Sequence, residues 1–166
     1  GKMGLVDALA VGPYFRNGEE EGEEDHFIAA LDKGWDAIFD SVHRTVDEMF
    51  DPSTSVGREL HANSALAEKY GKPLVDYEAG QHYTTWTGTP SAIIAPMNRR
   101  PEMYGVYQEF LDHWFQLPNA GTVTLFQLSS LYNDYEAFGL REYYDQPLSE
   151  LHKRRAVIDW INEHKD

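Results

Sequence analysis

The sequence predicts an α/β protein in which short parallel strands alternate with helices along a chain of 166 residues. Apolar runs at residues 4–14, 73–78 and 122–128 are typical of buried strands. The stretches between them repeat apolar residues every three or four positions, as helices do. Strands separated by helices need crossover connections, which make neighbouring strands parallel. Since 42% of the residues are hydrophobic and 13% aromatic, we expect a single domain over residues 1–166 with its own core.

The N-terminal half supplies the first strand and two helices. The strand expected from Gly4 to Tyr14 is apolar on both faces, as in the interior of a parallel sheet. A long helix is predicted from Phe27 to Met49 and a second one from Glu59 to Tyr70, with Gly71 as the residue that ends it. The second strand then starts at Pro73. The face of the second helix that is expected to be buried holds Leu60, Leu66, Ala67 and Tyr70.

The C-terminal half continues the alternation. Residues 84–98 contain glycine and two prolines and are expected to form a long irregular loop. A helix is predicted over residues 104–114, a third strand over 122–128 and a polar, aromatic loop over 129–147. Ser149 is expected to cap the last helix. Its buried face is predicted to hold Val157, Trp160 and Ile161, while Trp35 and Trp114 are expected to pack in the core from the earlier helices.

The charge of the chain limits its partners. A formal net charge of −14 disfavours nucleic acids and anionic membrane surfaces, whereas neutral substrates such as sugars are compatible with it. No apolar run approaches the roughly 20 residues of a membrane-spanning helix, and no signal peptide is visible. The absence of cysteine excludes disulfides, a thiol nucleophile and cysteine-based metal sites, and it leaves the compartment open.

Glu78 is the candidate catalytic residue. It ends the second predicted strand, and side chains at the carboxyl ends of parallel strands project into the ligand-binding mouth of α/β proteins. Tyr77 and His82 could hydrogen-bond substrate hydroxyls or tune Glu78, and Gln81 could bind a sugar hydroxyl. The alternative is that Glu78 only accepts backbone hydrogen bonds at the start of a loop.

Three segments carry a resemblance to a known group of enzymes. They are Asp7–Phe15, Ala67–His82 and Phe138–Pro147, and together they extend over nearly the whole chain. They resemble the last three βα units of clan-A-like (β/α)8 glycoside hydrolases and of bacterial cellulose-binding-protein-like barrels that carry a Tyr-Glu-Gly-Gly-Gln-His-type motif. Ala79 stands where such relatives often have glycine. The resemblance implies a partial (β/α)8 TIM-barrel-like fold of three parallel strands with flanking helices.

The same resemblance implies a function. It places Glu78 on the nucleophile position of a retaining glycoside hydrolase, at the end of strand seven. Strand four, which carries the acid/base residue in such enzymes, is missing. Since a complete barrel needs roughly 200–250 residues, we expect the chain to be the C-terminal part of a longer protein with little activity of its own. Secretion or a periplasmic location is what the resemblance would imply.

An oligo- or polysaccharide is the expected ligand, because aromatic rings stack on the apolar faces of sugars. Trp86, in a loop rich in threonine and glycine, is the first choice for such a contact. The full set of expected substrate-binding residues is Tyr14, Tyr77, Gln81, His82, Trp86 and Phe126. Candidates for a second carboxyl group are Glu136, Glu142 and Asp134.

Other chemistries lack their sequence signals. The seven histidines show no His-Glu-x-x-His spacing, no glycine-rich loop cradles a phosphate, and Ser129 lacks the context of a nucleophile elbow. The acidic run from Glu19 to Asp25 has no calcium-loop pattern and is expected to be a solvated loop. No metal and no cofactor are predicted.

Two other functions are compatible with the sequence. The chain could be a non-catalytic carbohydrate-binding protein or degenerate barrel, in which Glu78 only hydrogen-bonds sugar. It could also be an α/β unit that forms homo-oligomers through open strand edges, because unpaired edges need a partner.

Overall fold

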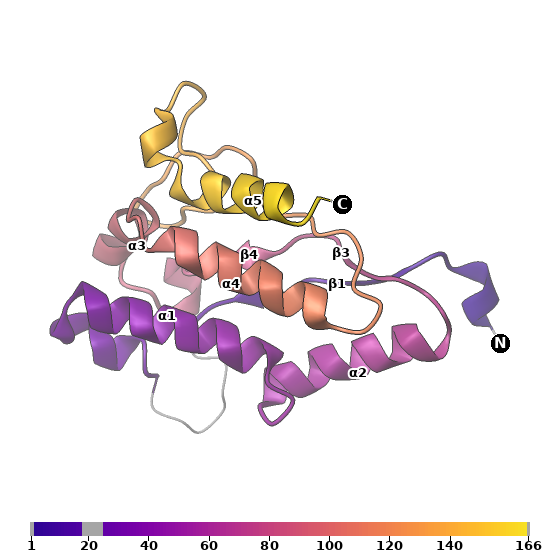
Figure 1. The fold of residues 1–166 in the computed structure, drawn as a ribbon. Coiled ribbons are helices and arrows are strands. Elements are labelled where there is room, and N and C mark those ends of the chain that lie inside the picture. Colours follow the sequence, from indigo (N-terminus) through magenta and orange to yellow (C-terminus); the bar gives the residue numbers. More distant parts are fainter. Residues whose placement is uncertain (1, 18–24, 166) are drawn as a thin grey trace.

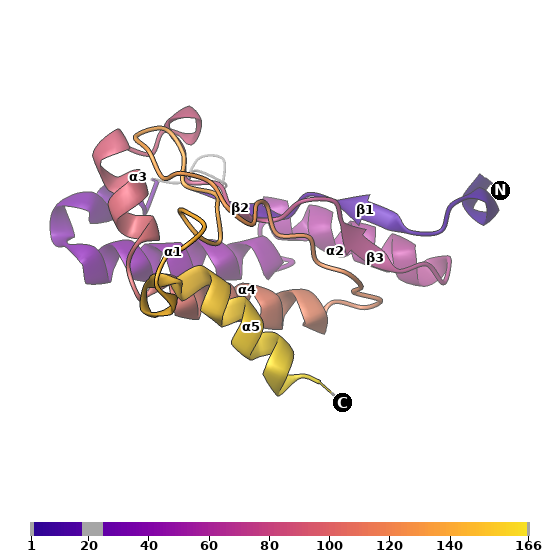
Figure 2. The ribbon, with the colours of Figure 1, turned by 90° about the horizontal axis from the view of Figure 1, so that it is seen from above.

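The structure is a computed structural model that describes residues 2–17 and 25–165. The chain is a mixed α/β protein in which short parallel strands run behind a group of helices (Figure 1). Seen from above, α1, α4 and α5 lie on the same side of the strands (Figure 2). Most of the predicted acidic loop, Glu19 to Glu24, lies outside the described residues.

The strands form two small parallel sheets that follow one another along the same pair of segments. β1 (Leu9–Val11) pairs with β3 (Leu74–Asp76), and β2 (Tyr14–Phe15) pairs with β4 (Gly80–Gln81). Parallel pairing of the first two predicted strands is therefore confirmed. Residues 12–13 connect β1 to β2, whereas residues 77–79 connect β3 to β4. The second segment therefore has one more residue than the first between the two pairings.

A third segment lies beside β3 without forming a regular strand. Isolated parallel bridges join Leu74 to Ala120 and Ala79 to Leu125. The Phe126 N–H donates to the Ala79 carbonyl at 2.9 Å. The three predicted strand regions thus lie side by side in the order of the sequence, although the third is held by single bridges rather than by a continuous ladder.

Helices and 3-10 turns fill the connections. The α-helices are α1 (Trp35–Phe50), α2 (Ser55–Lys69), α3 (Ser91–Asn98), α4 (Met103–Gln116) and α5 (His152–Glu163). The 3-10 turns are η1 (Lys2–Leu5), η2 (Ile28–Lys33), η3 (Thr85–Thr87) and η4 (Leu148–Glu150). α4 packs between α1 and α5, and α2 packs on α1, β1 and β3. No helix in the described part of the chain is both long and apolar enough to cross a membrane.

The ends of α2 follow directly from its sequence. The Thr54 side chain accepts a hydrogen bond from the Gly57 N–H and so caps the first turn. At the other end, Gly71 has φ +59°, its N–H donates to the Glu68 carbonyl, and the Lys72 N–H reaches back to Ala67. This is a Schellman motif, and it confirms Gly71 as the residue that ends the helix.

The core lies between the helices and one face of the strands. Large side chains from α1, α4 and the strands are fully buried there, among them Phe15, Val42, Val46, Leu74, Phe110 and Trp114. Leu9 and Leu125 also pack on this core, whereas Ala10, Thr124 and Phe126 are exposed. Parallel strands are usually covered on both faces, so the described residues leave one face of this sheet open.

Several sequence expectations are wrong in detail. The first strand is short and only half-buried, because the chain before Leu9 forms η1 and an exposed bend. Gly34, with φ +96°, divides the predicted long helix into η2 and α1. The predicted loop 84–98 contains α3, whose Ile94, Ala95 and Met97 are buried.

Three expectations for helix faces are also corrected. Leu66 and Tyr70 are exposed although they follow the apolar pattern of α2, because α1 and the strands cover only the side that holds Leu60 and Ala67. Ile161 of α5 is exposed as well, while Trp160 is buried. Ser149 lies in η4 and does not cap α5, which begins after Leu151 without a side-chain cap.

Candidate functional site

A hollow of about 340 Å³ opens at the carboxyl ends of the parallel strand segments. Its lining residues are Tyr14, Glu78, His82, Trp86, Phe126, Gln127, Glu136 and Phe138. Glu78 and four of the six expected substrate-binding residues therefore meet in one place. Gln127 lies in the third predicted strand and Phe138 begins the third segment of the resemblance, but neither is among the expected site residues.

Glu78 stands in the segment that carries the extra residue, with anchored residues on both sides. Before it, the buried carboxylate of Asp76 accepts a hydrogen bond from the Thr124 N–H at 2.6 Å. After it, the Ala79 N–H donates to the Thr124 carbonyl at 2.9 Å. An extra residue in a strand redirects the side chains next to it. Here the two anchors hold the backbone of residues 77–79 while Glu78 lines the hollow.

Tyr14 is the partner of Glu78. Burial raises the pKa of the Tyr14 hydroxyl, and the negative charge of Glu78 and a side-chain hydrogen bond with it raise the pKa further. The hydroxyl therefore stays protonated in the neutral range and donates to the carboxylate. This hydrogen bond fixes the orientation of Glu78 and spreads its negative charge.

His82 forms an aromatic wall of the hollow. Its ring lies between those of Tyr14 and Phe138, at centroid distances of 5.1 and 5.5 Å. Burial lowers the pKa of His82, the charge of Arg16 lowers it further, and Glu78 acts in the opposite direction. The imidazole is thus neutral at pH 7 and offers one hydrogen-bond donor and one acceptor.

Trp86 projects from an anchored turn. It is 76% exposed and occupies the centre of η3, where the Thr84 N–H donates to the Thr87 hydroxyl at 3.1 Å. The buried Asn17 donates to the Thr87 carbonyl at 2.7 Å, and the Thr85 N–H donates to the Tyr135 carbonyl at 3.2 Å. An exposed indole on a backbone held in this way is a rigid platform.

The wall that holds Glu136 and Phe138 is fixed from behind by two buried side chains. The Ala137 carbonyl accepts hydrogen bonds from Gln81 Nε2 at 3.1 Å and from Lys153 Nζ at 2.8 Å. Lys153 also donates to Asn98 Oδ1 at 3.0 Å, and burial lowers its pKa well below the ordinary value. Lys153 was missed because a lysine on an amphipathic helix is normally exposed.

Two of the expected binding residues lie outside the hollow. Gln81 is fully buried, and its amide oxygen accepts from the Tyr83 N–H at 2.9 Å, so both ends of its side chain are engaged by the protein. Tyr77 is 62% exposed and approaches Gly12 instead of the hollow. The structure thus places Gln81 behind the site and Tyr77 beside it.

Of the three candidates for a second carboxyl group, Glu136 alone lines the hollow with Glu78. Glu142 accepts hydrogen bonds from both Nε and Nη2 of Arg99, at 2.9 and 2.5 Å, and lines a different hollow. Asp134 is exposed. Among the described residues, Glu78 and Glu136 are therefore the two carboxylates that line this hollow.

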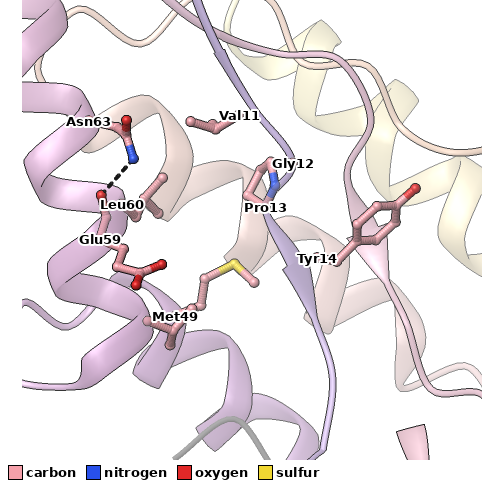
Figure 3. Close-up of a pocket in the computed structure, with 9 residues that line it drawn as sticks. Val11, Gly12, Pro13, Tyr14, Met49, Glu59, Leu60 and Asn63 are labelled. Atoms are coloured by element: carbon pink, nitrogen blue, oxygen red, sulfur yellow. Dashed lines mark hydrogen bonds between the residues drawn. The ribbon is translucent and has the colours of Figure 1, made fainter. Parts of the chain in front are cut away.

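A second hollow, of about 180 Å³, lies between α2 and β1–β2 (Figure 3). The Asn63 amide there donates to the Glu59 carbonyl at 2.9 Å, and the ring of Tyr14 points away from both residues. This hollow combines the apolar side chains of Met49 and Leu60 with one carboxylate. Tyr14 contributes to the lining of both hollows, but among the described residues the second hollow has Glu59 as its one carboxylate, whereas the larger hollow combines two carboxylates with an imidazole. The larger hollow is therefore the candidate site.

Comparison of the chain with protein-family models, with curated proteins and with solved structures found no match. The candidate site is therefore defined by its own geometry.

Proposed function

We propose that the larger hollow binds an oligo- or polysaccharide and that Glu78 is the nucleophile of a retaining glycoside hydrolase. In this proposal the chain carries the last three βα units of a (β/α)8 barrel. One observation carries it: the carboxylate of Glu78, held by Tyr14, shares a hollow beside parallel strand segments with the exposed ring of Trp86. The barrel assignment is supported by the order of the strand segments, because β1, β3 and residues 120–125 lie side by side in the order in which they occur in the sequence.

The lining of the hollow suits a neutral, many-hydroxyl ligand. Trp86, Phe126 and Phe138 offer flat apolar surfaces to the faces of sugar rings. The neutral His82, together with Glu78 and Glu136, offers hydrogen-bonding groups to sugar hydroxyls. An anionic ligand would be repelled by the net charge of −14.

The proposed reaction takes two steps. Glu78 attacks the anomeric carbon while a carboxylic acid gives its proton to the leaving oxygen, so that the carbon–carboxylate bond forms as the glycosidic bond breaks. Water then attacks the same carbon, loses a proton to the second carboxylate and frees Glu78. The Tyr14 hydroxyl orients Glu78 through their hydrogen bond. In this chain Glu136, the second carboxylate of the hollow, would take the role that the acid/base residue has in a full barrel. We expect turnover to be slow for this reason.

Binding is tested by titrating the protein with soluble polysaccharides and following tryptophan fluorescence and heat. The Trp86→Ala variant should bind at least about tenfold more weakly, which corresponds to about 1.4 kcal/mol. Tyr144→Ala is the matched control, because Tyr144 is also a highly exposed aromatic residue but does not line the hollow. Equal binding by all three proteins would refute the sugar platform.

Catalysis is tested with a panel of aryl glycosides. Glu78→Gln should abolish any turnover, while Glu59→Gln, in the second hollow, should keep the wild-type rate. If wild type and Glu78→Gln both lack turnover but bind sugar through Trp86, the chain is a carbohydrate-binding protein and the nucleophile assignment fails. Turnover that persists in Glu78→Gln would also overturn it.

A further inference from the structure

Two pairs of metal-ligating side chains face each other across α1 and α4, which lie side by side in both views (Figures 1 and 2). His43 and Asp47 stand four residues apart on α1, and Glu109 and His113 stand four residues apart on α4. Residues at this spacing share one face of a helix. Each helix therefore presents one imidazole and one carboxylate to its neighbour.

The cluster is compact. Single ligand atoms of Asp47, Glu109 and His113 all lie within 4.8 Å of one another, and His113 Nε2 is 3.0 Å from Asp47 Oδ1. The ring of His113 is stacked on Phe50 at a centroid distance of 5.3 Å, which limits its rotation. His43 Nδ1 hydrogen-bonds Glu109 Oε2 and so orients that carboxylate.

We propose that Asp47, Glu109 and His113 form a binding site for a divalent transition-metal ion of the Zn²⁺ type, with His43 as the residue that positions Glu109. Zinc binds imidazole nitrogen and carboxylate oxygen at about 2.0–2.2 Å, so tetrahedral ligand atoms lie roughly 3.3 Å apart. His113 Nε2 and Asp47 Oδ1 already have nearly this separation, and the ligand atom of Glu109 lies within 4.8 Å of both, so it needs to move by at most about 1.5 Å, which side-chain rotation can supply.

The donor set selects the class of metal. An imidazole combined with carboxylates suits zinc, copper and nickel, whereas calcium and magnesium prefer sites built from oxygen alone. The hydrogen bond from His43 to Glu109 has the form of the outer-shell contacts that orient metal ligands. Water would complete the coordination, because Asp47 is 62% exposed on its side chain and the cluster is open to solvent.

The site is separate from the sugar-binding hollow. None of the residues that line that hollow belongs to α1 or α4. A metal ion here would join two core helices whose ligands are 66 residues apart in sequence, so we expect it to stabilise the fold. The proposal therefore stands or falls independently of the glycosidase assignment.

The test uses the untagged protein after dialysis against a chelator. Zn²⁺ is titrated by calorimetry and by the shift in Tm, and Co²⁺ by its visible absorption, which reports coordination by nitrogen and oxygen. We expect one ion per chain, a Tm that rises by several degrees and is restored by chelator, and no comparable response to Ca²⁺ or Mg²⁺.

Variants locate the ion. Asp47→Asn and His113→Gln should each weaken Zn²⁺ binding at least about tenfold, and His43→Gln should weaken it less, as a positioning residue. His26→Gln is the matched control, because His26 also pairs with a carboxylate of α1, Glu48, at 3.2 Å but lies outside the cluster. Asp47 is exposed, so its replacement leaves the fold intact, as circular dichroism would verify. Equal binding by wild type and Asp47→Asn, or an equal loss in His26→Gln, would overturn the proposal.

Discussion

Replacing Asp76 by asparagine should stabilise the protein at neutral pH. The Asp76 carboxylate is buried, one of its oxygens accepts from the Thr124 N–H, and the other has no hydrogen-bond partner among the described residues. Burial raises the pKa of Asp76 from 3.8 to about 6, although the hydrogen bond from Thr124 acts in the opposite direction. At neutral pH the folded protein therefore contains this carboxylate in its ionised form, and its burial lowers the free energy of unfolding.

The magnitude follows from linkage. In the unfolded chain the pKa is near 3.8, so between pH 4 and 6 the folded state binds the additional proton. The free energy of unfolding thus falls as the pH rises through this window, and the penalty is complete above about pH 6. A shift of about two units corresponds to about 3 kcal/mol. Asparagine keeps the acceptor for Thr124 but leaves its amide group unpaired, which reduces the expected gain to about 1–2 kcal/mol.

The assay is urea unfolding of wild type and Asp76→Asn at half-unit steps from pH 4 to 8. Because the cost of the unpaired amide does not depend on pH, Asp76→Asn should be less stable than wild type by about 1 kcal/mol near pH 4 and more stable by about 1–2 kcal/mol at pH 7. Tm should change by about 2–4 °C for each kcal/mol. Asp145→Asn controls for the loss of one exposed negative charge. A difference that does not change with pH, or a destabilised Asp76→Asn at pH 7, would refute the burial and pairing described for Asp76.

Four further predictions test other parts of the structure. Gly105→Ala should stabilise α4 by up to about 1 kcal/mol, because the added methyl group meets His43 at an ordinary 3.6 Å. Gly57→Ala should lower the free energy of unfolding by more than about 2 kcal/mol, since its methyl group would collide with the Asp51 carbonyl. If Gly57→Ala and Gly105→Ala had the same effect in urea unfolding, the packing described for α2 would be contradicted. Thr54→Ala should cost about 1 kcal/mol by the same measurement, and no loss would mean that the cap is not formed. We also propose that the chain forms homo-oligomers through its open strand edges, so sedimentation velocity should show a dimer or larger species, and a monodisperse monomer would count against this.

The position of Glu78 could be predicted because it depends on local order. A helix ended by Gly71 and a short apolar run followed by a carboxylate are visible in the sequence. The predicted strand end is wrong by two residues, because β3 ends at Asp76 and Glu78 lies between the two parallel pairings, close to Tyr14. Trp86 follows from composition, since a tryptophan among threonines and glycine is typical of an exposed turn.

The sides taken by Tyr77 and Gln81 could not be predicted, because the extra residue at 77–79 interrupts the alternation of side chains along the strand. One inserted residue moves every following side chain to the other face. Gln81 therefore turns inward to bind Ala137, and Tyr77 stays outside the hollow. The sequence carries no signal for such an insertion, since it is defined only relative to the neighbouring strand.

Helix α3 and the α1–α4 cluster were missed for different reasons. Pro90 and Pro96 are typical of loops, yet Pro90 stands at the N-cap, where it needs no N–H, and Pro96 lies within the short helix. The cluster escapes a search for ligands on one helix because its members are shared between two helices. Each pair alone has ordinary helical spacing, so the cluster becomes visible only when α1 and α4 are packed together.

The same irregularity links the stability of the sheet to the candidate site. In a regular parallel ladder the Thr124 N–H would bond the main-chain carbonyl of Asp76, whereas here it bonds the Asp76 side chain. The next main-chain hydrogen bond to the third segment is made by the Ala79 N–H, so the ladder with that segment is interrupted at the step where Glu78 lines the hollow. A buried carboxylate with a raised pKa is thus tolerated because it takes the place of a ladder hydrogen bond at the point where the strand departs from regular geometry. Extra residues in strands are over-represented next to active sites, so the place of this one, beside Glu78 and the hollow that it lines, supports the proposal made for Glu78.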